Sequence, residues 1–152
     1  MVTLKQMTSK EFDTFLERAV QNYAEEKTEA GNWAPEEALE NSKQDFQRLL
    51  PERENSADNY LYTIWDEEIE AGSIWLAKIG KEAGYIYDIY IDPAHQGKGY
   101  GKQAMLEIEE VAKDLGFNRI ELHVFGHNQA ARNLYEKLDY EITNLIMAKK
   151  LS

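Results

Sequence analysis

The first fifty residues carry apolar side chains at the three- and four-residue spacing of amphipathic helices. We expect the first helix to begin after an N-cap at Ser9 and to run to about Glu26. Gly31 interrupts the pattern, and Pro35 suits the first turn of a second helix that reaches about Leu50. The N-terminal third is therefore predicted to be mainly helical.

From residue 59 onward, runs of β-branched and aromatic residues alternate with turns and then with two helical patterns. The expected strands are Val2–Met7, Asn59–Trp65, Ala71–Ile79, Gly84–Ile91, Arg119–Phe125 and Tyr140–Lys149. The expected helices of the second half are Lys102–Leu115 and Asn128–Leu138. This order predicts an α/β (α+β) fold with one mixed central sheet. Its early strands would be antiparallel, its strands across the later crossover parallel, and helices would cover both faces.

Composition narrows the function classes. A chain of 152 residues with 43% hydrophobic and 30% charged residues is typical of one globular domain, here residues 1–152. The chain has no Cys, which excludes disulfides, thiolate metal ligands and a cysteine nucleophile. No apolar run approaches the roughly 20 residues that span a bilayer. The first residues also lack the apolar core of a signal peptide. We therefore expect a cytoplasmic protein that has no membrane partner.

The net charge of −11 argues against nucleic acid as a partner, because phosphate recognition normally needs a basic patch. An acidic balance mildly favours a cationic substrate such as an amine. The same carboxylates could equally serve only to keep the protein in solution.

The segment Gln96–Gly101 holds three glycines between the expected strand Gly84–Ile91 and the expected helix Lys102–Leu115. Backbone N–H groups that begin a helix have no internal partner and lie at its positive end, so they favour phosphate. The segment is not a Walker A loop, because Lys102 is followed by Gln103. Glu121 lies near the spacing of a dinucleotide-binding acid, so a dinucleotide stays open, as does a tight turn without a ligand.

Two motifs resemble those of a known family. The segment Ile91–Gly101, which contains Gln-Gly-Lys-Gly-Tyr-Gly, resembles the acetyl-CoA signature Q/R-x-x-G-x-G/A of the GNAT superfamily of N-acetyltransferases. The segment Asn128–Leu138 is similar to the N-x-x-A-x-x-L-Y helix of the same superfamily. Two motifs in the family's order are more specific than either alone, and the resemblance covers about Ile86 to Lys149.

The resemblance implies a role for each matching residue. Acetyl-CoA would be the acetyl donor, with its pyrophosphate on the backbone amides of Gln96, Gly97, Lys98, Gly99, Tyr100, Gly101 and Lys102. The backbone of Ile89, Tyr90 and Ile91 would pair with the pantetheine arm as an added strand does. Asn128 would bind the cofactor by a hydrogen bond, and Tyr135 would stand near the thioester sulfur.

The chemistry of acetyl transfer to an amine needs an acid and a base but no metal. A primary amine with a pKa of about 10.4 must lose a proton before it attacks, and the leaving thiolate must gain one. Tyr135, with an ordinary pKa of about 10, can donate that proton. Asp88 and His123 are the candidate bases, and each could instead be structural. Strand alternation places Asp88 on the opposite face from Tyr87.

Two details fall outside the motifs. Trp33, between the first two helices, lies in a region that often lines the acceptor pocket in family members, so it could line one here. Asp139 stands where the family usually has the Gly that ends the helix, and Asp tolerates the left-handed conformation better than most residues.

Two functions follow from the sequence. The first is an acetyl-CoA-dependent N-acetyltransferase that acts on an amine of a small molecule or a protein. The alternative is a non-catalytic domain that binds acyl-CoA as a sensor. Such domains are often dimers, so a homodimer is possible.

Overall fold

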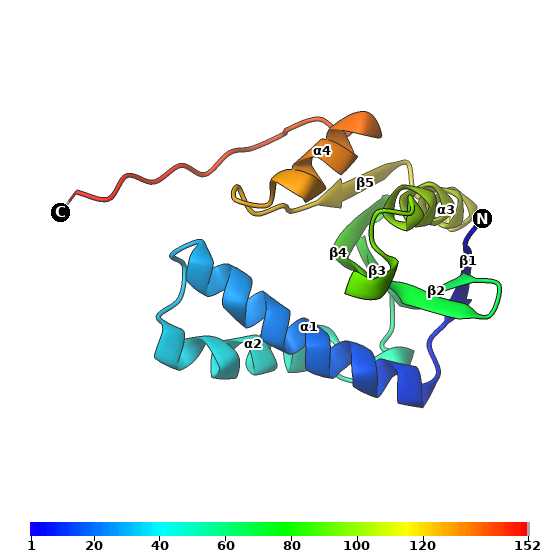
Figure 1. The fold of residues 1–152 in the computed structure, drawn as a ribbon, viewed down its shortest axis with the longest axis horizontal. Coiled ribbons are helices and arrows are strands. Elements are labelled where there is room, and N and C mark those ends of the chain that lie inside the picture. The colour runs from blue at the N-terminus through cyan, green and yellow to red at the C-terminus, as the bar shows by residue number, and fades with distance from the viewer. Residues whose placement is uncertain (152) are drawn as a thin grey trace.

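The computed structural model describes residues 1–151 as one mixed sheet with helices on both faces (Figure 1). The strands are β1 (Thr3–Gln6), β2 (Asn59–Asp66), β3 (Ile69–Ile79), β4 (Ala83–Ile91) and β5 (Arg119–Leu122). The helices are α1 (Ser9–Glu29), α2 (Pro35–Leu49), α3 (Tyr100–Asp114) and α4 (Gln129–Lys137), with short 3-10 turns at Arg53–Asn55 and Pro93–His95.

The strands follow each other in space in their chain order, β1-β2-β3-β4-β5. The first four pair antiparallel, and β4 pairs parallel with β5 across the crossover helix α3. This arrangement confirms the predicted mixed sheet. α1 and α2 lie against one face, and α3 and α4 lie on the other (Figure 1).

Each face of the sheet has its own hydrophobic core. On the α1–α2 side, Phe15 and Phe46 pack against Trp75 of β3, which is 1% exposed. On the other side, Met105 and Ile108 of α3 are completely buried against the sheet. Burial of one apolar face of each helix against the sheet is what holds the layers together.

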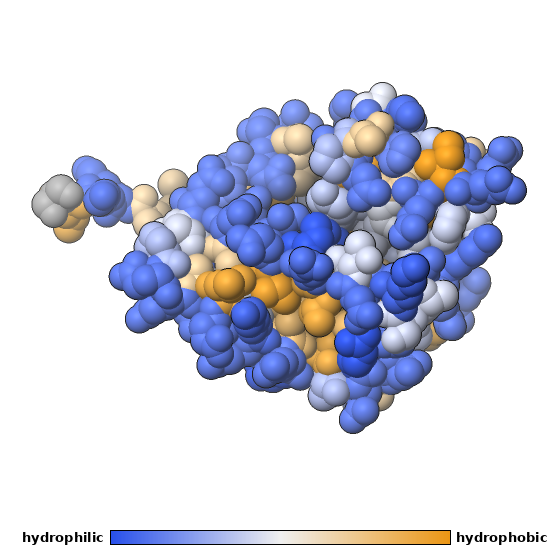
Figure 2. Space-filling model, turned by 60° about the horizontal axis from the view of Figure 1, so that its bottom comes forward, coloured by the Kyte–Doolittle hydropathy of each residue, from blue (hydrophilic) through white to orange (hydrophobic). Residues whose placement is uncertain are grey.

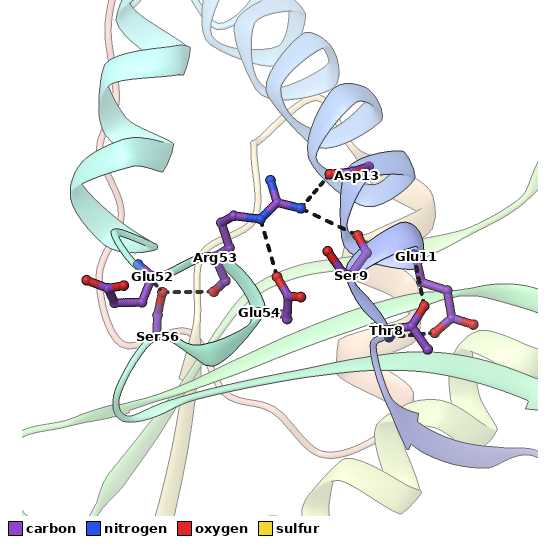
Figure 3. Close-up of polar contacts among 8 residues, drawn as sticks. All are labelled: Thr8, Ser9, Glu11, Asp13, Glu52, Arg53, Glu54 and Ser56. Atoms are coloured by element: carbon purple, nitrogen blue, oxygen red, sulfur yellow. Dashed lines mark hydrogen bonds and ion pairs between the residues drawn. The ribbon is translucent and has the colours of Figure 1, made fainter.

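α1 begins one residue earlier than expected, because Thr8 rather than Ser9 is its N-cap. The Thr8 side chain accepts from the amide of Glu11, and the Glu11 carboxylate accepts from the amide of Thr8, which forms a capping box (Figure 3). Arg53 then ties the segment after α2 to the start of α1 by donating to Asp13 and to the Ser9 carbonyl. These contacts fix the entry to the helical layer.

The C-terminal segment differs most from expectation. Residues 140–151, predicted to be a strand from Tyr140 to Lys149, pair with no strand among the described residues. Tyr140 still packs on Tyr135, and the chain after Thr143 is extended and runs away from the body (Figure 1). β5 also ends at Leu122 instead of Phe125. A strand needs a partner for its backbone groups, and the described part of the chain offers none to this segment.

The end of α4 agrees with the sequence. Asp139 takes a φ of 67°, and the amides of Asp139 and Tyr140 donate to the carbonyls of Glu136 and Tyr135. This is the Schellman pattern, in which a residue in the left-handed region closes the helix. Asp139 therefore occupies the left-handed position at the helix end that Gly usually occupies.

The surface on the α1–α2 side is mostly hydrophilic around one apolar band (Figure 2). A shallow hollow between these helices is lined by Phe12, Leu16, Val20 and Phe46. Among residues 1–151, no helix is long and apolar enough to cross a membrane.

Candidate active site

A cleft opens where β4 and β5 separate. The two strands are in register from Ala83 opposite Arg119 to Ile86 opposite Leu122, and within residues 1–151 no further pair follows. The cleft, of about 710 Å³, lies between the second half of β4, the segment 123–125, α4 and the α1–α2 layer. Strands that part in this way leave backbone N–H and C=O groups free for a ligand.

A bulge in β4 shapes one wall of this cleft. Trp75 of β3 lies opposite Asp88, and Leu76 lies opposite Ile86, so Tyr87 is the extra residue. The Tyr87 ring stacks on Trp75 with ring centroids 4.6 Å apart. Asp88 binds an arginine of α1, so both side chains lie on the α1–α2 side of the sheet. Simple alternation had placed Tyr87 and Asp88 on opposite faces, and that prediction is wrong because the bulge shifts the pattern.

Gly72 of β3 allows the second half of β4 to pack closely. A Cβ atom at Gly72 would lie 1.9 Å from the Tyr90 carbonyl oxygen. An isolated glycine within a strand pattern often marks such a close approach, and this signal could have found Gly72 in the sequence.

The glycine loop lies at the start of α3, as the sequence predicts. Gly97 and Gly99 have φ values of 80° and 81°, which other residues rarely adopt. Gly99 is the N-cap of α3 and provides no side-chain cap, so the first amides of the helix are left for another partner. A Cβ at Gly101 would make only ordinary contacts, so no steric need for glycine exists there.

Some side chains of the glycine loop form hydrogen bonds within the protein, and others are exposed to solvent. Tyr100 is 7% exposed in the core and donates to Asp66, so only its backbone could meet a ligand. Gln96 lines the cleft, and its side chain donates to the Ile91 carbonyl. Lys98 and Lys102 are exposed to solvent.

α4 places Asn128 and Tyr135 along the same wall of the cleft. Asn128 is the N-cap of α4, and its side-chain oxygen accepts from the Ala131 amide at 3.1 Å. A hydrogen bond from Asn128 to a ligand would therefore have to come from its Nδ2. Tyr135 is 9% exposed, and burial, followed by the nearby Asp88 charge, raises the pKa of its phenol to about 12. Tyr135 is therefore fully protonated at neutral pH.

Asp88 is held by Arg18 of α1, which the sequence did not single out. The two Arg18 Nη atoms lie 3.3 and 3.0 Å from the two carboxylate oxygens, and Nη2 also donates to Ser73 Oγ at 2.9 Å. The same guanidinium lies 3.9 Å from the centre of the Tyr90 ring. A bidentate pair of this kind fixes a carboxylate in position. A single arginine beside the apolar face of an expected helix gave no sequence signal for this role.

His123 faces the same cleft from the segment after β5. It is half-buried and packs edge-on against Phe125, with ring centroids 4.8 Å apart. Burial, and then the positive charge of Lys27, lowers the pKa of its imidazole. His123 is therefore neutral at pH 7 and able to accept a proton.

Trp33 and His127 lie outside the lining of the cleft. Trp33 is not among the residues that line it and packs edge-on against Tyr23, which does line it, with ring centroids 5.5 Å apart. His127 binds Glu26 at 2.6 Å and so joins the loop before α4 to the end of α1. Within residues 1–151, no cluster of three His, Asp or Glu side chains is arranged to hold a metal ion.

The sequence matches a family model over most of its length. Residues 16–140 fit the model described as "Acetyltransferase (GNAT) family". Two similar relatives from Bacillus subtilis strain 168 are described as uncharacterized N-acetyltransferases. YycN is 36% identical, covering 99% of both chains, and YdgE is 37% identical, covering 98% of both. The chain belongs to the GNAT family of acetyltransferases.

Solved structures agree with this assignment. The crystal structure of YycN from Bacillus subtilis matches with a TM-score of 0.96 at 36% identity, covering 100% of this chain and 99% of that one. The N-acetyltransferase PaiA from Thermoplasma acidophilum, solved in complex with coenzyme A, matches with a TM-score of 0.66 at 20% identity over 91% of this chain and 88% of that one. The second likeness shows the shared fold.

Proposed function

We propose that this protein transfers an acetyl group from acetyl-CoA to a primary amine, with both substrates bound at once. The observation that carries the proposal is the cleft between β4 and β5, which has the glycine loop at one end and the protonated Tyr135 in its wall. Family membership supports acetyl transfer, and the CoA complex of PaiA supports the donor.

The cleft fits the donor by the groups that it offers. The amides at the start of α3, from Gly99 to Lys102, suit the pyrophosphate, because they lie at a helix N-terminus that lacks a side-chain cap. The free edge of β4 at Ile89–Ile91 suits the amide groups of pantetheine. Asn128 would add a hydrogen bond from Nδ2.

When bound, acetyl-CoA supplies an acetyl thioester, so a C–N bond to the amine forms while the C–S bond to the thiolate breaks. Tyr135 supplies the proton for the departing sulfur. Its raised pKa, about 12, keeps the phenol protonated at neutral pH, so the proton is in place when the C–S bond breaks and negative charge develops on the sulfur. The Asp88 charge contributes to that raised pKa, and Arg18 holds Asp88 in place.

His123 is the proton acceptor that we favour for the incoming amine. Its imidazole is neutral because burial and Lys27 disfavour the charged form. Asp88 is the weaker candidate, because both of its oxygens accept from Arg18. A base that already binds a guanidinium must give up that bond to accept a proton.

The acceptor would enter from the α1–α2 side of the cleft. The aromatic rings of Tyr23 and Tyr85 line this side, together with the ion pairs Glu26–His127 and Asp45–Arg48. Ring faces attract an ammonium group. The rings therefore support a primary amine as the acceptor class.

Removal of the Tyr135 hydroxyl is the most direct test. Tyr135→Phe should slow acetyl transfer about 100-fold or more, the usual contribution of a general acid, while calorimetry shows CoA binding unchanged. Tyr140→Phe is the matched control, because Tyr140 contacts the Tyr135 ring but donates to Glu109 outside the cleft. A Tyr135→Phe variant that transfers acetyl at the normal rate would refute the acid, and a wild type that binds CoA without transfer to any amine would favour the sensor alternative.

The donor site is tested separately by Gly99→Glu. The variant places a negative charge and a strained backbone where the pyrophosphate would bind, so calorimetric CoA binding should be lost. Gly80→Glu adds the same charge at another glycine of positive φ, 60°, in the turn between β3 and β4. Equal binding by the two variants would contradict the placement of the pyrophosphate.

A further inference from the structure

Three carboxylates line the cleft, and each already has an arginine or histidine partner within the protein. The pairs are Asp88 with Arg18, Asp45 with Arg48, and Glu26 with His127. Both arginines belong to the same lining, so their charges are also opposed. A ligand that bound any of these groups would compete with a contact that the protein already makes.

Lys27 differs from these groups. It lines the cleft and is partly buried, but among residues 1–151 it forms no salt bridge. Its Nζ instead lies 5.6 Å from the centre of the Tyr23 ring and 5.3 Å from the centre of the Trp33 ring. Ring faces attract a cation but do not satisfy its N–H donors as an oxygen acceptor does. Lys27 is therefore an ammonium group that is held in place with donors available to a ligand.

Lys27 lies on the acceptor side of the cleft. It belongs to the last turn of α1, which faces the loop before α4 (Figure 1). The helix dipole favours a lysine in that turn but does not require its side chain to face the cleft. The charge is close enough to His123, the proton acceptor that we favour, to contribute to the lowered pKa of that imidazole. An anionic group bound to Lys27 would therefore lie near the reacting amine.

The rest of the lining on this side is largely aromatic. Its rings include Tyr23, Phe46, Tyr85 and Phe125. A polycation would place a second ammonium group among these rings and beside the positive charge of Lys27, which repels it. The carboxylates of the lining already have the partners given above, so none is free to receive it. The pocket therefore suits one amine on an apolar body, with any further charge negative.

We propose that Lys27 binds a carboxylate of the acceptor, so that the acceptor is a primary amine that also bears an acid group, as an amino acid does. The inference rests on the proposed acetyl transfer and narrows its acceptor class. Lys27 contacts the substrate but no bond that forms or breaks, so it is a specificity-determining residue. The ring faces would bind the ammonium of such an acceptor, and Lys27 would bind its carboxylate.

Matched acceptors test the preference for an acid group. Each pair is an amino acid and its carboxamide, such as phenylalanine with phenylalaninamide and β-alanine with β-alaninamide, and putrescine represents the polycations. For at least one pair, kcat/KM should be about 10-fold higher for the carboxylate than for its amide and for putrescine, because a charge-assisted hydrogen bond is lost in both. Equal or better transfer to the amides and putrescine would overturn the inference and leave the proposed acetyl transfer standing. No transfer to any amine would overturn both.

Substitutions at Lys27 test whether this residue carries the preference. Lys27→Met keeps an apolar stem without the charge, so the carboxylate-to-amide ratio of kcat/KM should fall to about 1. Lys27→Arg should retain the ratio, and Lys27→Glu should invert it by repulsion of the carboxylate. The ratio compares two acceptors on one variant, so a change in the His123 pKa that affects both acceptors cancels. Lys10→Met, in the first turn of α1, is the control and should keep the wild-type ratio.

Calorimetric CoA binding should be unchanged in all four variants, which shows that each of them folds. A Lys27→Met variant that binds CoA and keeps the wild-type ratio would overturn the assignment of the carboxylate to Lys27. A ratio that falls in Lys27→Met and is retained in Lys27→Arg would support it, because a residue needed only for folding would change transfer to both acceptors alike.

Discussion

The two halves of β4 have the same kind of sequence but different surroundings. The first half, Ala83–Ile86, pairs with β3 on one side and with β5 on the other. The second half, Tyr87–Ile91, pairs only with β3 and faces the cleft. The bulge at Tyr87 stands at the boundary.

This difference shows how one strand serves both stability and function. Ile86 in the first half is 3% exposed and belongs to the core, although it borders the cleft, whereas Tyr87, Asp88 and Tyr90 in the second half line the cleft with polar or aromatic side chains. The paired half holds the strand in place, so the unpaired half can keep its polar backbone groups available for a ligand.

Of the changes considered, a side chain at Gly72 should disturb the second half of β4 most. Gly72→Ala places a Cβ 1.9 Å from the Tyr90 carbonyl oxygen, so the backbone must shift. We expect a loss of about 3 kcal/mol in the free energy of unfolding and much weaker CoA binding. Urea denaturation and calorimetry measure both. Gly126→Ala is the control, because its new Cβ would meet nothing within 4 Å; similar losses in both variants would contradict the close approach.

The first half of β4 should affect stability more than it affects the site. Ile86→Ala removes a buried side chain and should cost about 2–4 kcal/mol in the free energy of unfolding. Because Ile86 borders the cleft but is only 3% exposed, CoA binding by the folded protein should weaken much less than in Gly72→Ala. Ile89→Ala, partly buried in the second half, should cost only about 1 kcal/mol. Thermal melts compare the stability of the two variants. A larger loss for Ile89→Ala than for Ile86→Ala would contradict the assignment of stability to the first half of β4.

The smallest expected effect concerns His123, which faces the second half of β4 across the cleft. If neutral His123 is the base, the rate is retained above its pKa and falls as the pH drops through that value. Lys27→Met removes one of the two causes that lower the pKa, so the acid side of the pH–rate profile should move to higher pH. Lys10→Met, on the first turn of α1, should leave the profile unchanged. A profile that does not move with Lys27 would argue against His123.

Local patterns in the sequence predicted most of the fold. Helix boundaries were right to within a few residues because caps and breakers act locally, as Pro35 and Asp139 do. The prediction failed for Tyr87 and for the chain after Tyr140. A bulge depends on the neighbouring strand, and a terminal strand depends on a partner, so neither can be predicted from local periodicity.

The candidate site shows the same division. The two GNAT motifs indicated the glycine loop, Asn128 and Tyr135 directly, and all of them lie at the cleft or at the start of α3. Arg18 was missed because it lies 70 residues from Asp88 in the chain. Trp33, a candidate for the lining, packs outside it against Tyr23.

By itself, the sequence determined the order of strands and helices, the glycine loop and the family motifs, because each depends on residues close together in the chain. Only the tertiary structure decided where β4 and β5 part, which arginine holds Asp88, and how deeply Tyr135 is buried. Those properties come from packing between distant segments. They set the electrostatics of the cleft, because burial and neighbouring charges control the pKa of each group.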